Sequence, residues 1–352
     1  MIRLAIIDND KLFLNKVSVY FNSKYGNEMS VNTYSRYDLF EAEQAVRRFD
    51  IIWGTRELVG LTEKLTKSNN FAYVVDQKNI SSIDDVKAIC KYQKPDVIYR
   101  KMLSIYSELD RAAGIIYGPE SGSNAKVIVV NGLAGGIGSS AYSAALSQKL
   151  TNNGHRVFYL DVSSFGTANV MFNGEGDFGL SDVFYSIKSK KGNIGLKIKS
   201  VVKEDRSKVA YFDTWNSPLD FYNIEHSDVF DLITELVKTN NYDYIVFDTK
   251  MDFTKEWIEF LNRVSNIILV GDDSDKCKVN SEKMVNIFDL LEKQEVADLH
   301  NRTLVAYNNI INTVPMQNRF GTISNIKHTS NRDMKNLVGY MSKHINLADL
   351  RN

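Results

Sequence analysis

A glycine-rich run at residues 131–143, NGLAGGIGSSAYS, is the part of the sequence best suited to binding chemistry. It follows an apolar segment and precedes a helical pattern, so its backbone N–H groups would lie at a helix N-terminus, where the helix dipole attracts phosphate. Phosphate-binding loops read G-x-x-x-x-G-K-[ST], and their lysine reaches the terminal phosphates of a nucleotide. Here Ser139 stands at the lysine position, and Ser140 stands where a hydroxyl normally contacts Mg²⁺. The run therefore predicts a phosphate cradle that lacks the charge of the lysine.

A carboxylate about a hundred residues further on supports this interpretation. Asp248 ends the apolar segment YDYIVFD, and a carboxylate at such a strand end orders a metal ion and its waters in nucleotide-binding proteins. A plain strand-to-helix turn would also contain glycines, and this simpler interpretation remains open. The position of the run between a strand and a helix favours the phosphate cradle.

Short apolar segments alternate with helical patterns along most of the chain, which is typical of parallel sheets covered by helices on both faces. The segments expected to form strands are 3–8, 49–54, 71–76, 96–101, 126–131, 156–161, 208–213, 243–248, 266–273 and 303–309. Residues 110–125, rich in Gly, Ser and Pro, read as a linker. The sequence therefore predicts two doubly wound α/β domains, residues 1–109 and 126–352.

The composition limits the classes of function. The chain has 352 residues with 43 basic and 43 acidic side chains, so it lacks the basic excess of a dedicated nucleic-acid binder. Two distant cysteines, Cys90 and Cys277, and no charged leader with an apolar run predict reduced thiols in the cytoplasm. No stretch approaches the roughly 18 to 20 apolar residues that span a bilayer.

Residues 126–352 resemble the MinD/ParA class of P-loop ATPases, whose loop reads K-G-G-x-G-K-[ST]. On this pattern the signature lysine of the family falls on Ala134 and its P-loop lysine on Ser139. The resemblance implies ATP and Mg²⁺ as ligands and a homodimer. The metal contacts that it implies are Ser140, Asp248 and Asp161. The nucleotide contacts that it implies are Gly135, Gly136, Ile137, Gly138, Ser139, Ser140 and Asn308, the last as the asparagine that reads adenine.

The same alignment predicts little hydrolysis. Both lysines are missing, and Ser163 replaces the second carboxylate of the D-x-D motif, which orients water in that family. Electrostatic contacts of this kind are each worth roughly 3 to 4 kcal/mol in a transition state. We therefore assign no catalytic residue. Binding rests on backbone groups that these changes spare, although a relic loop without nucleotide remains an alternative.

Residues 1–109 resemble a response-regulator receiver domain. Asp8 and Asp10 match the acidic turn after its first strand, and Lys101 matches its lysine after the fifth strand. The position of the phosphate-accepting aspartate falls on Gly54 or Thr55, neither of which is a carboxylate. The resemblance therefore implies a docking or targeting module rather than a phosphorylation switch.

A degenerate receiver followed by a MinD/ParA-like domain with an atypical loop is similar to the TadZ/CpaE proteins of tight-adherence (Flp-type, type IVb) pilus assembly. The resemblance implies a localisation scaffold that recruits the pilus secretion ATPase or other assembly proteins. It would act in the cytoplasm, at a cell pole or peripheral to the inner membrane. Two alternatives remain: a nucleotide-free interaction scaffold, and an active partition-type ATPase that acts on DNA. The neutral charge and Ala134 disfavour the second.

The C-terminal segment 332–350 carries an apolar stripe at helical spacing, Met334, Leu337, Val338 and Met341. A stripe of this kind is found both in helices that lie on a membrane and in helices that pack on their own domain. Because this one is short, the sequence favours packing and leaves peripheral membrane contact as the alternative.

Overall fold

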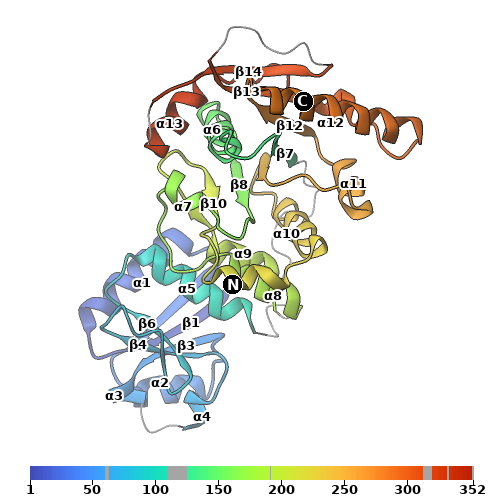
Figure 1. The fold of residues 1–352 in the computed structure, drawn as a ribbon. Helices are drawn as coiled ribbons and strands as arrows, with labels where there is room; N and C mark the ends of the chain where they lie inside the picture. The colour runs from blue at the N-terminus through green and yellow to red at the C-terminus, as the bar shows by residue number, and fades with distance from the viewer. Residues whose placement is uncertain (60–62, 110–124, 191, 312–318, 331–332, 351–352) are drawn as a thin grey trace. The chain divides into compact units, whose positions relative to one another are not determined.

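The computed structural model describes residues 1–59, 63–109, 125–190, 192–311, 319–330 and 333–350 (Figure 1). Its contacts divide the chain into two units, each of which is an α/β domain. The first unit comprises Met1–Ile116 together with Ser189–Val201, and the second comprises Tyr117–Lys188 and Val202–Asn352. The predicted linker 110–125 lies outside the described residues, apart from Ala125.

The sheet of the first unit is mostly parallel, with strand order β2-β1-β3-β4-β6-β5. In the described residues only the short β5 runs antiparallel to its neighbour. The strands are β1 (Ile2–Ile7), β2 (Met29–Tyr34), β3 (Ile51–Thr55), β4 (Phe71–Val75), β5 (Ser82–Ile83) and β6 (Val86–Cys90). The side chains of β1, β3 and β4 are buried almost continuously, as expected for strands covered on both faces.

The helices of the first unit follow from capping and apolar spacing. Asp10 caps α1 (Lys11–Tyr25) by accepting from two backbone N–H groups, and Leu14, Val17 and Phe21 form the buried face of this helix. The other helices are α2 (Tyr37–Gln44), α3 (Arg56–Val59), α4 (Glu63–Thr66), α5 (Pro95–Ser107) and α9 (Ile194–Val201).

One predicted strand of this unit is wrong. Residues 96–101 lie in α5, which begins with Pro95 in its first turn and continues the apolar spacing through Met102 and Ile105 to Ser107. The six-residue window was too short to show the helical period. The last long strand of the sheet is β6, which the sequence analysis missed.

The sheet of the second unit has the order β14-β13-β12-β7-β11-β8-β10-β9, and β9 alone is antiparallel to its neighbour in the described residues. The strands are β7 (Lys126–Gly132), β8 (Val157–Asp161), β9 (Lys203–Glu204), β10 (Ala210–Tyr211), β11 (Tyr244–Asp248), β12 (Asn266–Gly271), β13 (Thr303–Ile310) and β14 (Gly321–Lys327). The fold class predicted from the sequence, two mostly parallel α/β sheets, is confirmed.

The helices of the second unit alternate with these strands. They are α6 (Ser139–Asn152), α7 (Ala168–Met171), α8 (Leu180–Ser189), α10 (His226–Lys238), α11 (Lys255–Leu261), α12 (Asp275–Lys293) and α13 (Met334–Ser342), with the 3₁₀ helices η2 (Pro218–Asn223) and η3 (His300–Arg302). The C-terminal helix α13 packs on α6 through Val338 and Met341, in agreement with the preferred interpretation of its apolar stripe (Figure 1).

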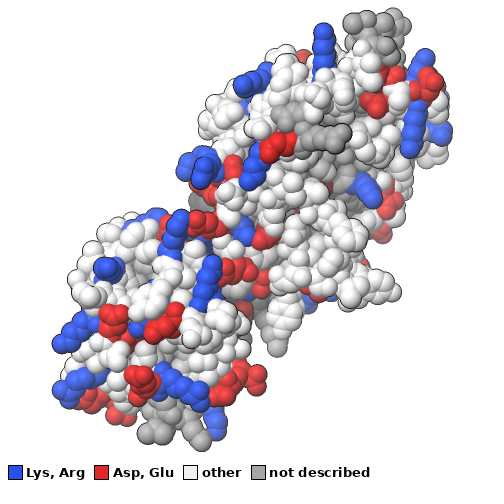
Figure 2. Space-filling model, turned by 60° about the vertical axis from the view of Figure 1, so that its left-hand side comes forward, with Lys and Arg blue, Asp and Glu red and all other residues white. Residues whose placement is uncertain are grey.

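Helix length and surface charge bear on which environments suit the chain. Among the described residues, no helix is long and apolar enough to cross a membrane. Basic and acidic side chains are interspersed on the face drawn in Figure 2, so the charges that cancel in the composition are also mixed on this face.

Candidate nucleotide site

The glycine-rich run connects β7 to α6 in the second unit, and β7 lies between β12 and β11. Gly136 and Gly138 have φ of +80° and +82°, which glycine adopts without the cost that other residues incur. A Cβ built on Gly135 or Gly136 would meet nothing within 4 Å, so the space above the loop is open. The loop therefore presents backbone at the N-terminus of α6, as an anion site requires.

Asn308 on β13 holds the loop in this conformation. Its amide Nδ2 donates to the carbonyl oxygen of Ile137 at 2.7 Å, and both side chains are buried. A Cβ on Gly138 would lie only 2.8 Å from the same nitrogen. The sequence resemblance assigns Asn308 to adenine recognition. The structure places it against the loop, where its amide oxygen and its second amide N–H would remain for a base.

The two serines that follow the loop occupy the first turn of α6. Ser139, at the position of the missing lysine, is half-buried, and its carbonyl accepts from the Ser143 hydroxyl at 2.9 Å. The Ser140 side chain lies beside Asp248, where it favours the ionised carboxylate and so partly offsets the rise of the Asp248 pKa. The structure thus brings two of the three predicted metal contacts together.

Asp161 and Asp248 end the adjacent parallel strands β8 and β11 and pair in register. Both carboxylates are buried. The Tyr159 hydroxyl donates to Asp248 at 3.0 Å. Burial, and secondarily the charge of Asp161, raises the pKa of Asp248 to about 7. A buried carboxylate with a raised pKa lacks a compensating cation, so this pair suits a divalent metal ion.

The residues after β8 are oriented toward Asp161. Ser163 donates to one carboxylate oxygen through its backbone N–H at 2.9 Å and its hydroxyl at 2.6 Å. The backbone N–H of Thr167 donates to the other oxygen at 2.9 Å. The serine that replaces the second carboxylate of the D-x-D motif is therefore bonded to the first one.

A third carboxylate, Asp213, was missed as a site residue. It follows β10, the next strand beyond β8, and forms an ion pair with the buried Lys203 of β9. Asn169 of α7 also donates to it. The segments RVFYLD, KVAYFD and DYIVFD all end in aspartate, and this repetition is the sequence signal that could have identified Asp213.

In the first unit, Lys91 lies where the sequence analysis placed Lys101. It follows β6, and its ammonium lies 3.6 Å from the fully buried Asp8 and 3.0 Å from Asp76. Burial raises the pKa of Asp8, which Lys91 only partly offsets. Lys101 lies instead on α5.

The two candidate positions for a phosphoryl acceptor are Gly54, which pairs in register with Ile7 at the end of β1, and Thr55. Neither Gly54 nor the following Thr55 offers a carboxylate. The first unit therefore keeps the acidic turn and the lysine of a receiver without its acceptor.

Residues 1–107 match the family model described as "TadZ-like, receiver domain". This part of the chain is a TadZ-like receiver domain. The match confirms the resemblance seen in the acidic turn and the missing acceptor. A search of curated proteins found no significant match to the chain.

Solved structures of MinD and ParA proteins are similar to this chain. A ParA family ATPase from Chlorobium tepidum TLS is 17% identical, with a TM-score of 0.47 over 62% of this chain and 90% of that chain. MinD from Pyrococcus horikoshii OT3, complexed with Mg-ADP, is 15% identical, with a TM-score of 0.46 over 60% and 85%. A putative plasmid partition protein from Borrelia burgdorferi B31, bound to AMPPNP, is 16% identical, with a TM-score of 0.39 over 62% and 90%. At such identities the likeness concerns the fold alone.

Proposed function

We propose that this chain is a dimeric, ATP-binding localisation scaffold for tight-adherence pilus assembly that hydrolyses ATP negligibly. The observation that carries the nucleotide part is the convergence of Ser140 and Asp161 on Asp248 at the N-terminus of α6. Hydroxyl and carboxylate oxygens are the ligands that Mg²⁺ prefers, and the helix N-terminus suits a phosphate.

The residues present fit Mg²⁺ and a triphosphate. Two buried carboxylates with a raised pKa at Asp248 need a cation, and the open space above Gly135 and Gly136 leaves room for phosphate beside the loop amides. Bound Mg²⁺ would supply the countercharge that the missing lysine does not. Ser140 and Asp248 would hold it, with Asp161 beside them.

The same geometry supports negligible hydrolysis. Ser139 and Ala134 offer no cation to stabilise charge on a transferring phosphoryl group. The Ser163 hydroxyl donates to Asp161, and it is a poor substitute for a carboxylate in orienting water. Nucleotide would therefore act as a bound ligand rather than as a substrate that turns over.

Two exposed aromatic side chains near the site support self-association. Phe165 follows β8 and is 79% exposed, and Phe253 follows β11 and is 40% exposed. Both follow the strands that end in Asp161 and Asp248, so a dimer formed across the ligand site would bring them into its interface. Because Ala134 cannot reach across a dimer as the signature lysine does in MinD/ParA proteins, these phenylalanines are the side chains that we assign to dimer contacts.

The pilus role rests on the TadZ-like receiver domain. Residues 1–107 match that family model, and neither Gly54 nor Thr55 offers a phosphoryl-accepting carboxylate. A domain with the receiver fold that cannot accept a phosphoryl group is suited to binding partner proteins. We propose that it recruits the pilus secretion ATPase or other assembly proteins in the cytoplasm, at a cell pole or at the inner membrane.

Calorimetric titration of the full chain with ATP in MgCl₂ tests the proposal. We expect micromolar binding with turnover near background. Asp248→Ala should abolish binding, whereas Asp252→Ala, which alters an exposed carboxylate in the following loop, should not. Absence of binding at millimolar ATP would overturn the nucleotide part, and robust turnover without a partner would overturn the scaffold role.

Sedimentation with and without Mg-ATP tests the dimer. Phe165→Ser with Phe253→Ser should give a monomer, whereas Val46→Ser, at a 91% exposed position of the receiver-like unit, should leave the dimer unchanged. A wild-type chain that is monomeric under all these conditions would contradict the dimer.

A further inference from the structure

Helix α9 belongs to the first unit, although its sequence lies within the second. The chain leaves the second unit after Lys188, forms α9 on α5, and returns to the second unit at Val202. Leu196, Ile198 and Val201 of α9 are buried. The receiver-like unit is therefore completed by residues 189–201.

The entry to α9 is built for close contact with the end of α5. Gly192 has a φ of +73°, and a Cβ at this position would lie 1.9 Å from the Ser107 carbonyl oxygen. The next residue, Asn193, donates its backbone N–H to that oxygen at 2.8 Å. Its side-chain oxygen accepts from the Leu196 N–H at 2.9 Å and so begins the helix. Only glycine at 192 permits this approach.

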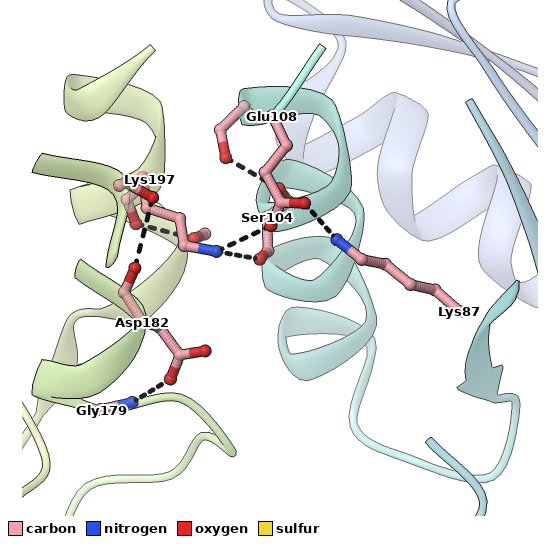
Figure 3. A network of polar contacts seen from close by, with 9 residues as sticks. Lys87, Ser104, Glu108, Gly179, Asp182 and Lys197 are labelled. Atoms are coloured by element: carbon pink, nitrogen blue, oxygen red, sulfur yellow. Dashed lines mark hydrogen bonds and ion pairs between the residues drawn. The ribbon is translucent and has the colours of Figure 1, made fainter. Parts of the chain in front are cut away.

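Two lysines of α9 form ion pairs within the first unit. The Lys197 ammonium, which is buried, donates to the Ser104 hydroxyl at 2.9 Å and to Glu108 at 3.0 Å, and Lys87 approaches Glu108 from the other side (Figure 3). Lys199 pairs with Glu28 at 2.7 Å. Because Lys197 contacts both Ser104 of α5 and its C-cap residue Glu108, removing the Lys197 ammonium removes polar contacts that hold α9 on α5.

The chain that follows the C-terminal end of α9 returns to the second unit, where it contacts Asp213. Lys203, two residues after α9 ends, is buried in its ion pair with Asp213. Asn169 of α7 also bonds Asp213, and Thr167, the residue before α7, donates to Asp161. Asp161 is thus connected to α9 through residues 167–169, then Asp213, and then Lys203 and the chain that precedes it.

We infer that ligand binding at the Asp161–Asp248 edge and docking of α9 on α5 are coupled, so that Mg²⁺ with a nucleotide loosens α9 and frees the α5 face of the receiver-like unit. This inference rests on the proposed nucleotide binding. A cation beside Asp161 competes for the oxygen that holds Thr167. Rearrangement of residues 163–169 then draws Asn169 from Asp213 and shifts Lys203, which is tied to the end of α9.

Coupling of this kind is reciprocal in binding free energy. If nucleotide loosens α9, then weakening the docking of α9 must tighten nucleotide binding by the same factor. Couplings between sites are typically about 5-fold or more in affinity. The prediction therefore has two independent readouts, one on α9 and one on the ligand.

Hydrogen exchange of the full wild-type chain gives the first readout. Exchange is compared without ligand and with MgCl₂ and AMP-PNP, and calorimetry in the same buffer establishes binding. We expect faster exchange in residues 194–201 and in α5 when the ligand is bound. Bound ligand with unchanged exchange in both segments would overturn the inference and leave the proposed function standing. Absence of binding overturns both.

Variants give the second readout. Lys197→Met and Gly192→Ala weaken the docking by different means, and each should lower the Kd for Mg-AMP-PNP about 5-fold or more. Lys208→Met is the matched control, because Lys208 is 77% exposed and pairs only with Glu204 among the described ion pairs. An unchanged or higher Kd in a docking variant that retains wild-type circular dichroism would overturn the inference. If one variant does not fold, the Kd of the other variant and the hydrogen exchange of the wild-type chain still test the inference.

Discussion

Asp161 and Asp248 end neighbouring parallel strands in register, so their two buried carboxylates share one edge of the sheet beside the glycine-rich loop. Desolvation and mutual repulsion disfavour ionising both. A bound cation relieves both effects. Without a cation, ionising the pair lowers the free energy of unfolding by an amount that depends on pH.

The first prediction concerns stability and pH. Asp248 has a pKa of about 7 in the folded chain, above its ordinary value of 3.8. Between these values the folded state holds a proton that the unfolded state has released, so stability is greatest below 3.8 and falls until the pH passes 7. Asp248→Asn removes this titration. The unfolding free energy of the variant minus that of wild type should therefore be about 3 kcal/mol larger at pH 8 than at pH 5.

Urea unfolding in EDTA at both pH values measures this effect. Asp231→Asn, which alters an exposed carboxylate of α10, should show the same stability difference from wild type at pH 5 and pH 8. A pH-independent effect of Asp248→Asn would mean that Asp248 is ionised in the folded chain at pH 5.

Restoring the missing charge is the second prediction. A lysine at position 139 would lie in the first turn of α6, beside the loop amides. Hydrogen bonds to charged groups contribute about 1.5 to 3 kcal/mol, so Ser139→Lys should tighten Mg-ATP binding about 10-fold or more. Ser139→Met adds similar bulk without charge and should not tighten binding. Equal affinities for both variants in calorimetry would place the phosphates elsewhere.

The third prediction separates backbone strain from a clash. Gly138 and Gly154 both have positive φ, but a Cβ would meet Asn308 only at Gly138, whereas nothing lies within 4 Å at Gly154. Alanine at φ > 0 costs roughly 1 to 2 kcal/mol. Gly154→Ala should lose about this much stability. Gly138→Ala should lose more and also weaken Mg-ATP binding. Thermal unfolding and calorimetry test the pair, and equal losses of stability would contradict the contact with Asn308.

The fourth prediction tests Lys91. Lys91→Met leaves the buried Asp8 without its cation, so we expect a loss of about 1 to 3 kcal/mol in unfolding free energy at pH 8. The loss should be smaller at pH 5, because the pKa of Asp8 is already raised and protonation relieves the charge. The double variant Asp8→Asn/Lys91→Met should recover part of the stability. A pH-independent loss in the single variant would show that packing alone is affected.

Local sequence determined the loop and the strands around it. NGLAGGIGSS between an apolar segment and a helical pattern predicted a turn at a helix N-terminus, and DYIVFD predicted a carboxylate, Asp248, at a strand end. These features depend on neighbouring residues, so propensity and spacing are enough to find them. Asp161 was assigned from the resemblance to MinD/ParA proteins. The helical residues 96–101 were misread because a short apolar run does not distinguish a strand from a buried helix.

Tertiary structure decided the contacts between distant residues. That Lys91 rather than Lys101 meets Asp8 and that Lys203 pairs with Asp213 depend on strand order. That α9 completes the receiver-like unit depends on contacts between residues up to 171 positions apart. Spacing along the chain carries no signal for such pairs, because each lysine looks like an ordinary solvated one. Burial, which only the fold produces, makes them specific.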